Sequence, residues 1–308
     1  MVSPAARREV VKGLVKRGEC SERRACELLD TARSTARYEK RVKSDEAALR
    51  KRIRKLAARH KRYGVRRILA RFRREGWRVN KKRVHRIWKE EGLQRKRKRK
   101  KKRVLGPTQG LPVKAEYPNH VWTYDFIEDR TERGGKLRML CVLDEFTREN
   151  HHIRVDRSIS AKKVIASLEW LFLLHGPPEY IRSDNGPEFV AKALRAWLAE
   201  RGAKTVYITP GSPWENPYIE SFNDKFRDEC LNMQVFISGR HAEEVVEAWR
   251  KEYNEERPHS SLNYMTPAEF AASCRNSSRP TASLRCGNGT PASESTKPEA
   301  TTLTAVGT

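Results

Sequence analysis

The sequence lacks most features of a secreted or membrane-inserted protein. Its six cysteines, at positions 20, 26, 141, 230, 274 and 286, contain no C-x-x-C pair. This spacing indicates neither a zinc finger nor a disulfide framework. No stretch approaches eighteen apolar residues, and the N-terminus lacks the apolar region of a signal peptide. We therefore expect a soluble protein of the reducing cytoplasm that has no contact with a membrane.

Acidic residues are scarce in the first third of the chain. Residues 1–105 hold 40 Lys and Arg against 11 Asp and Glu, a net charge of +29, whereas the other 203 residues hold 25 against 28, a net charge of −3. Such an asymmetry favours a polyanion partner, most often nucleic acid. We therefore expect the N-terminal third to bind double-stranded DNA.

Short helices are predicted throughout residues 1–94. Residues 1–44 have the pattern of a helix-turn-helix-like segment, in which Ser21 is a plausible N-cap; an ordinary basic helical hairpin is the alternative. Residues 45–94 predict a three-helix DNA-binding domain, whose third helix starts after an Asn80 cap. The residues predicted to contact DNA at the start of that helix are Lys81, Lys82 and Arg83. These side chains could contact the phosphates alone, which would position the protein without reading the base sequence.

Two segments contain too few apolar residues to form a hydrophobic core. Residues 95–115 are predicted to be a basic linker, disordered or extended, that starts with nine consecutive basic residues. Counterion release along the DNA backbone would make this linker useful for binding. The Ser-, Thr-, Pro- and Ala-rich residues 273–308 predict a disordered tail. The linker's predicted DNA contacts are Arg95, Lys96, Arg97, Lys98, Arg99 and Lys100.

Strand patterns start near residue 120, and residues 116–272 predict an α/β domain. The expected order is three antiparallel strands (121–127, 137–144 and about 150–155), a helix (161–175), a strand (179–183), a helix (191–201) and a strand (204–209). Two helices, 217–232 and 242–255, follow. The first and fourth strands can be neighbours if the intervening helix acts as a crossover connection.

Three carboxylates of this domain are candidate metal ligands. In the first strand, Trp122, Tyr124 and Phe126 are expected on one face, and Val121, Thr123, Asp125 and Ile127 on the other. Asp125 thus lies among apolar neighbours, where an unpaired carboxylate would be costly. Asp184 follows the fourth strand, and Glu220 lies on a later helix. Together they could bind paired Mg²⁺ ions and leave positions open for a phosphate. The rival pair, Asp144 and Glu145, is interpreted as structural and paired with Arg148.

The sequence around these carboxylates resembles the catalytic core of DDE transposases and retroviral integrases. The similar motifs are W-T-Y-D-F (122–126), S-D-N-G-P-E-F (183–189) and N-P-Y-I-E-S-F-N-D-K-F-R (216–227). With Y-G-V-R-R-I (63–68), R-E-G-W-R-V-N-K-K-R-V-H-R-I-W (74–88) and Y-N-E-E-R-P-H-S-S-L-N-Y-M-T-P-A-E-F (253–270), the chain resembles the second-reading-frame product of bacterial insertion sequences. The similar segments cover about residues 20–270.

The resemblance implies an RNase H-like integrase core, a mixed five-stranded sheet with flanking helices, preceded by an all-α helix-turn-helix-type region. It also implies Mg²⁺ or Mn²⁺ held by Asp125, Asp184 and Glu220, and strand cleavage followed by strand transfer at element ends. Asn185 and Gly186 would shape the loop beside Asp184. Asn185 and Arg227 are the DNA contacts predicted in the core.

The implied partners are the DNA of the element ends and of the target, further copies of the chain on that DNA, and an upstream-frame product fused to or paired with it. Two other functions are compatible with the same residues. One is a catalytically inactive DNA-binding remnant or regulator. The other is an RNase H-like nuclease that acts on an RNA–DNA hybrid.

Overall fold

The computed structural model describes residues 3–39, 43–94, 113–209 and 215–276. The basic residues predicted to contact DNA at 95–100, and the predicted tail beyond 276, lie outside these ranges. Internal contacts divide the chain into two compact units, Met1–His60 and Lys61–Thr308. Within the described ranges, no helix is both long enough and apolar enough to span a bilayer.

The first unit contains four helices in its described part: α1 (Pro4–Lys16), α2 (Glu22–Leu28), α3 (Arg33–Ala36) and α4 (Glu46–Arg59). Val11, Ala25 and Ala36 are buried where α1, α2 and α3 meet. The Ser21 hydroxyl accepts a hydrogen bond from the Arg24 amide at 3.3 Å, so the predicted N-cap of α2 is confirmed. The short α3 is therefore held against α1 and α2 by a small apolar core.

The second unit starts with two helices, α5 (Val65–Arg74) and α6 (Lys81–Glu90). The Asn80 side chain accepts a hydrogen bond from the Lys82 amide at 2.8 Å, which confirms the predicted cap of α6. Each helix is followed, after its C-cap residue, by a glycine with positive φ, 78° at Gly76 and 67° at Gly92, a conformation that glycine adopts without strain. At the start of α6 the structure places Lys81 and Lys82 exposed and Arg83 half-buried.

The same unit contains a five-stranded sheet of β1 (Val121–Arg130), β2 (Lys136–Asp144), β3 (Asn150–Asp156), β4 (Tyr180–Ser183) and β5 (Lys204–Tyr207). The strand order is β3-β2-β1-β4-β5. The pairs β1–β2 and β2–β3 are antiparallel, whereas β1–β4 and β4–β5 are parallel. The predicted mixed sheet is confirmed, and so is the predicted adjacency of the first and fourth strands.

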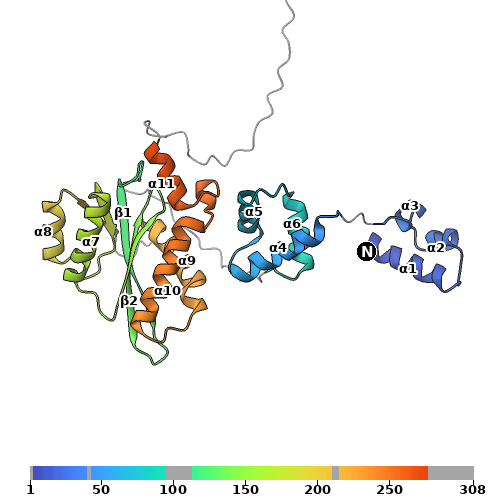
Figure 1. The fold of residues 1–308 in the computed structure, drawn as a ribbon, viewed down its shortest axis with the longest axis horizontal. Coiled ribbons are helices and arrows are strands. Elements are labelled where there is room, and N and C mark those ends of the chain that lie inside the picture. The colour runs from blue at the N-terminus through green and yellow to red at the C-terminus, as the bar shows by residue number, and fades with distance from the viewer. Residues whose placement is uncertain (1–2, 40–42, 95–112, 210–214, 277–308) are drawn as a thin grey trace, which may run out of the picture. The chain divides into compact units, whose positions relative to one another are not determined.

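Helices cover both faces of this sheet (Figure 1). On one face α7 (Ala161–His175) and α8 (Lys192–Glu200) pack on a core that includes Trp122 and Tyr124. On the other face α9 (Pro217–Glu229) and α10 (Gly239–Lys251) pack on a core that includes Ile127. The alternation of β1 side chains between the faces is the one that the sequence predicts.

The C-terminal part differs in two details from the sequence expectation. Helix α10 begins at Gly239, three residues earlier than expected, and continues into a π-helical turn, Glu252–Glu256. A last helix, α11 (Pro267–Asn276), extends past residue 272, where the domain was expected to end. Phe270 and Ala271 anchor α11 in the core, and the helix continues to Asn276, within the segment that was predicted to be a disordered tail.

Candidate active site

Asp125 lies on the face of β1 that is covered by α9. Its neighbour on the same face, Thr123, donates a hydrogen bond to Asn216, just before α9, at 2.6 Å. One Asp125 oxygen accepts a hydrogen bond from the Asn223 side chain of α9 at 2.9 Å, and the other accepts one from the Phe126 amide at 2.7 Å. Helix α9 therefore fixes the orientation of the Asp125 carboxylate.

The three predicted carboxylates interact electrostatically. Burial is the main reason why the pKa of Asp125 rises to about 6, and the negative charges of Asp184 and Glu220 raise it further. The hydrogen bonds from Phe126 and Asn223 act in the opposite direction. Asp125 therefore lies in a cluster of negative charge formed by β1, the end of β4 and the first turn of α9.

The loop after β4 orients Asp184. The Asp184 carboxylate accepts a hydrogen bond from the Gly186 amide at 3.0 Å. A Cβ atom at Gly186 would lie 3.1 Å from the same oxygen, closer than a carbon normally approaches. The Asn185 side chain donates to the Ile208 carbonyl at 2.8 Å, which ties the loop to the chain after β5. Asn185 and Gly186 thus shape this loop, and the Asn185 amide group is engaged within the protein.

Glu220 and Arg227 lie on α9, seven residues apart and so on one side of the helix. Glu220 is in the first turn and exposed. Arg227 is exposed and donates to the Glu128 carbonyl of β1 at 3.0 Å. Asn223 lies between the two on the same side, which explains why it reaches Asp125. Sequence reasoning missed Asn223, although its spacing of three residues from Glu220 was a usable signal.

Within the described ranges, no three His, Cys, Asp or Glu side chains are close enough together to hold a metal ion. The donors themselves nevertheless suit Mg²⁺ or Mn²⁺, because all three are carboxylates and these cations prefer oxygen ligands. A cation would also relieve the repulsion that contributes to the raised pKa of Asp125. The residues present therefore fit such an ion by the chemistry of their donor atoms.

Asp144 and Glu145 have the structural role that was predicted. The predicted pairing with Arg148 is an electrostatic interaction without a direct ion pair: burial raises the pKa of both carboxyl groups, and the Arg148 charge opposes that rise. Glu145 forms an ion pair with Arg182 of β4 at 2.7 Å, and both side chains are fully buried. Asp144 accepts hydrogen bonds from the amides of Asn119, Phe146 and Thr147. Arg148 instead stacks on the Tyr218 ring, 3.7 Å from its centroid. The β2–β1–β4 strand order brings Arg182 to Glu145, and this order is not apparent from local sequence.

Sequence reasoning also missed a second anchor of the Asp184 loop. Glu188 forms an ion pair with Arg138 of β2 at 2.5 Å. The Arg138 guanidinium lies over the Phe126 ring at 3.9 Å, and that ring stacks on Phe189 at 4.7 Å. Glu188 and Phe189 both belong to the S-D-N-G-P-E-F motif. The motif therefore holds the loop against β1 and β2, in addition to presenting Asp184.

Comparison with known proteins shows the family to which the chain belongs. Two family models described as "Integrase core domain" match residues 115–213 and 201–267, and a model described as "HTH-like domain" matches residues 43–101. The "Insertion element IS407 uncharacterized 31.7 kDa protein" of Burkholderia multivorans (strain ATCC 17616 / 249) is 42% identical over 255 residues, which cover 83% of this chain and 92% of that protein. The chain belongs to this family of insertion-element proteins with an integrase core.

Other relatives carry similar names. The "Insertion element IS476 uncharacterized 39.2 kDa protein" of Xanthomonas euvesicatoria is 39% identical over 274 residues, 89% of this chain and 79% of that protein. The "Putative transposase InsK for insertion sequence element IS150" of Escherichia coli (strain K12) is 28% identical over 219 residues, 68% of this chain and 77% of that protein. The integrase core predicted from the sequence motifs is thus confirmed, and so is the helix-turn-helix-type region before it.

Proposed function

We propose that the chain is a DNA transposase that cleaves and joins DNA strands at the ends of an insertion element. The observation that supports this most strongly is the electrostatic coupling of Asp125 with Asp184 and Glu220 in a chain that matches the integrase core models. No serine, cysteine or tyrosine nucleophile is needed, because the attacking group would be a water or a DNA 3′-hydroxyl.

In this proposal Asp125, Asp184 and Glu220 hold Mg²⁺ or Mn²⁺. The bound ions would activate the attacking oxygen and stabilise the leaving oxygen of an in-line displacement. Asn223 would keep one Asp125 oxygen in a fixed direction, as outer-shell hydrogen bonds do at metal sites. The Gly186 amide would do the same for Asp184.

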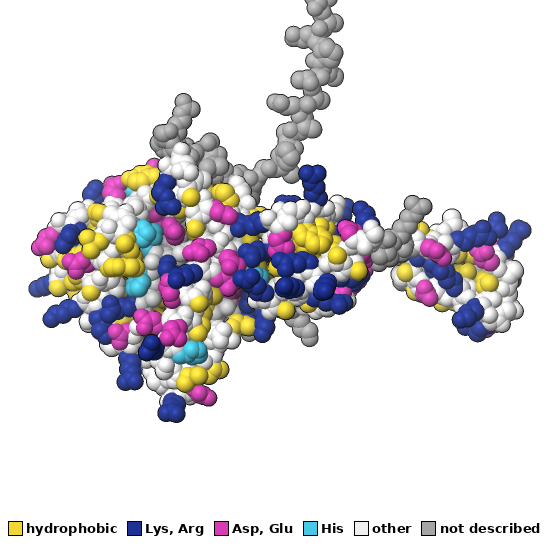
Figure 2. Space-filling model, in the orientation of Figure 1, with side chains coloured by type: hydrophobic (Ala, Val, Ile, Leu, Met, Phe, Trp, Pro, Cys, Tyr) yellow, Lys and Arg dark blue, Asp and Glu magenta, His cyan; other side chains and the backbone are white. Residues whose placement is uncertain are grey.

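The transposase assignment also implies DNA and further protein chains as binding partners. Lys81, Lys82 and Arg83 at the start of α6, the basic residues 95–100 and Arg227 of α9 would bind DNA phosphates. Basic side chains are dense on the visible surface of the helices within residues 43–94 (Figure 2). We further propose that several copies of the chain assemble on DNA in the bacterial cytoplasm, with or without an upstream-frame product.

Joining of labelled element-end DNA into a target plasmid tests the proposal. We expect joined products with Mg²⁺, and none with EDTA or with the Glu220→Gln variant. An RNA–DNA hybrid included in parallel distinguishes the nuclease alternative. Cleavage of the hybrid without DNA joining would replace the transposase assignment with that of a nuclease. DNA binding without either activity would favour a regulator.

A further inference from the structure

The arginines of α5 fall on two different sides of the helix. Arg67, Arg71 and Arg74 follow the i, i+4, i+7 spacing of one helical face, and Arg66 and Arg73 follow the i, i+7 spacing of another. Side chains of the first set are 27%, 16% and 29% exposed, and each contacts a carboxylate. Arg66 and Arg73 are exposed, and neither forms an ion pair or side-chain hydrogen bond with any described residue.

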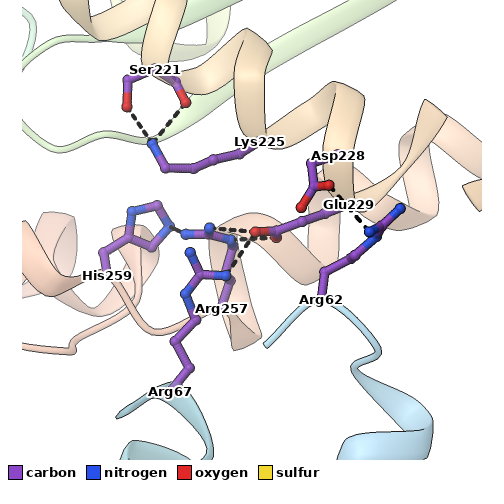
Figure 3. Close-up of polar contacts among 8 residues, drawn as sticks. All are labelled: Arg62, Arg67, Ser221, Lys225, Asp228, Glu229, Arg257 and His259. Atoms are coloured by element: carbon purple, nitrogen blue, oxygen red, sulfur yellow. Dashed lines mark hydrogen bonds and ion pairs between the residues drawn. The ribbon is translucent and has the colours of Figure 1, made fainter. Parts of the chain in front are cut away.

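The deepest contact of the first set is with Glu229, the last residue of α9 (Figure 3). Glu229 is 8% exposed and accepts a hydrogen bond from Arg67 at 2.7 Å. Arg257, 3% exposed, donates two more hydrogen bonds to Glu229, each at 2.7 Å. Burial alone would raise the pKa of Glu229, but the two guanidinium groups hold it below its usual value. Arg67 thus binds the C-terminal end of α9, the helix whose first turn contains Glu220.

Two further arginines extend this contact to other segments. Arg71 donates to the carboxylate of Glu256 at 3.1 Å and to its backbone carbonyl at 3.2 Å. Arg74 forms an ion pair with Glu269 of α11 and donates to the Tyr264 carbonyl at 3.1 Å. The arginines on one face of α5 therefore bind carboxylates of α9, the π-helical turn and α11, and two of them also bind backbone carbonyls.

On the other face of α5, Arg73 lies close to the start of α6. A surface hollow is lined by Arg73, Trp77, Arg78 and Asn80, together with Gly76 and Val79. Arg78 is exposed, and Asn80 caps α6, whose N-terminal amides favour an anion. The hollow therefore brings Arg73 and Arg78 next to the cap of α6, and Lys81 and Lys82 follow that cap in sequence.

We propose that the two faces of α5 have two different partners. Arg67, Arg71 and Arg74 bind the integrase core, whereas Arg66 and Arg73 bind DNA backbone phosphates. A phosphate could reach the first set only by displacing a carboxylate, whereas the guanidinium donors of the second set are open to water. Seven residues of helix separate Arg66 from Arg73 by about 10 Å, enough to reach different phosphates. The DNA half of this assignment rests on the proposed function.

Four charge reversals on the same helix test the division: Arg67→Glu and Arg71→Glu on the core-binding face, and Arg66→Glu and Arg73→Glu on the outward face. All four change the net charge equally, so the pairs control for each other. Thermal unfolding of the full chain without DNA is measured first. We expect Arg67→Glu and Arg71→Glu to lower Tm by several degrees, and the outward variants to leave it unchanged. Adding Glu256→Arg to Arg71→Glu should restore most of the loss.

Binding to a DNA duplex is then measured over a series of salt concentrations. We expect each outward variant to reduce the slope of log K against log salt by about 1, as the loss of one phosphate contact does. The core-binding variants should keep the wild-type slope. Equal slope losses in both pairs, or no rescue of Arg71→Glu, would overturn the division.

A wild-type chain that binds no DNA would overturn both the assignment of Arg66 and Arg73 and the proposed function. The Tm rescue would still decide whether Arg71 binds the core, because that measurement contains no DNA.

Discussion

Asp125 is a partly buried carboxylate on a strand, and its burial has an energetic cost. It lies on a face of β1 that is otherwise covered by α9, where burial raises its pKa to about 6. Asn223 and the Phe126 amide compensate in part by donating to its two oxygens. Alternation along the strand predicted the face, but the compensating Asn223 comes from a helix almost a hundred residues later. Such a partner is set by the tertiary fold and not by the local pattern.

Replacing Asn223 should weaken metal use without destroying the fold. Asn223→Ala removes a hydrogen bond to Asp125, and losses of this kind typically cost about 10- to 100-fold in metal affinity or activity. We expect the Mg²⁺ concentration for half-maximal DNA joining to rise by such a factor. Asp224→Asn, on the exposed neighbour, is the control and should leave it unchanged. An unchanged Mg²⁺ requirement for Asn223→Ala would show that Asp125 does not depend on this contact.

At the scale of elements, periodicity located most helices and strands within a few residues. The β3-β2-β1-β4-β5 arrangement could be anticipated only in part, as the possible adjacency of β1 and β4. The partner of Glu145 could not be anticipated, because Arg182 reaches it from another strand of the sheet. For the same reason the core-binding role of Arg67 was missed: a basic helix in a basic region favours a DNA contact, and only the folded chain places Glu229 beside it.

The buried pair of Glu145 and Arg182 should stabilise the connection between β2 and β4. Glu145→Gln leaves the Arg182 charge buried without a counter-ion, which typically costs about 3–5 kcal/mol. We expect urea unfolding to show a loss of that order in the free energy of unfolding. Glu244→Gln is a suitable control, because its ion pair with Arg240 is on the surface and contributes little. A loss no larger than that of the control would mean that the pair is dispensable.

At the scale of the whole molecule, charge is divided between the two ends of the chain. The first 105 residues carry +29 and the rest −3. Because α5 binds Glu229, Glu256 and Glu269, part of this asymmetry is used inside the protein. Other basic residues of this region, among them Arg17, Arg37 and Arg86, also pair with carboxylates. Counting basic residues alone therefore overstates the number that could contact DNA.

Residues 95–100 should contribute a large share of the salt dependence of DNA binding. Replacing all six with Gln should lower the slope of log K against log salt by up to about 5, if each contacts a phosphate. Replacing Lys96, Lys98 and Lys100 with Arg preserves the charge and should keep the slope. If the Gln variant also kept the wild-type slope, the linker would not lie on DNA.

The central claim is that Asp125, Asp184 and Glu220 together form a metal-dependent centre for DNA strand joining. The most direct test compares Mg²⁺-dependent joining of element-end DNA by the wild-type, Asp184→Asn and Asp224→Asn proteins, with DNA binding measured for each. We predict that Asp184→Asn loses joining entirely but binds DNA with nearly wild-type affinity, and that Asp224→Asn retains both. Full joining activity in Asp184→Asn would contradict the account.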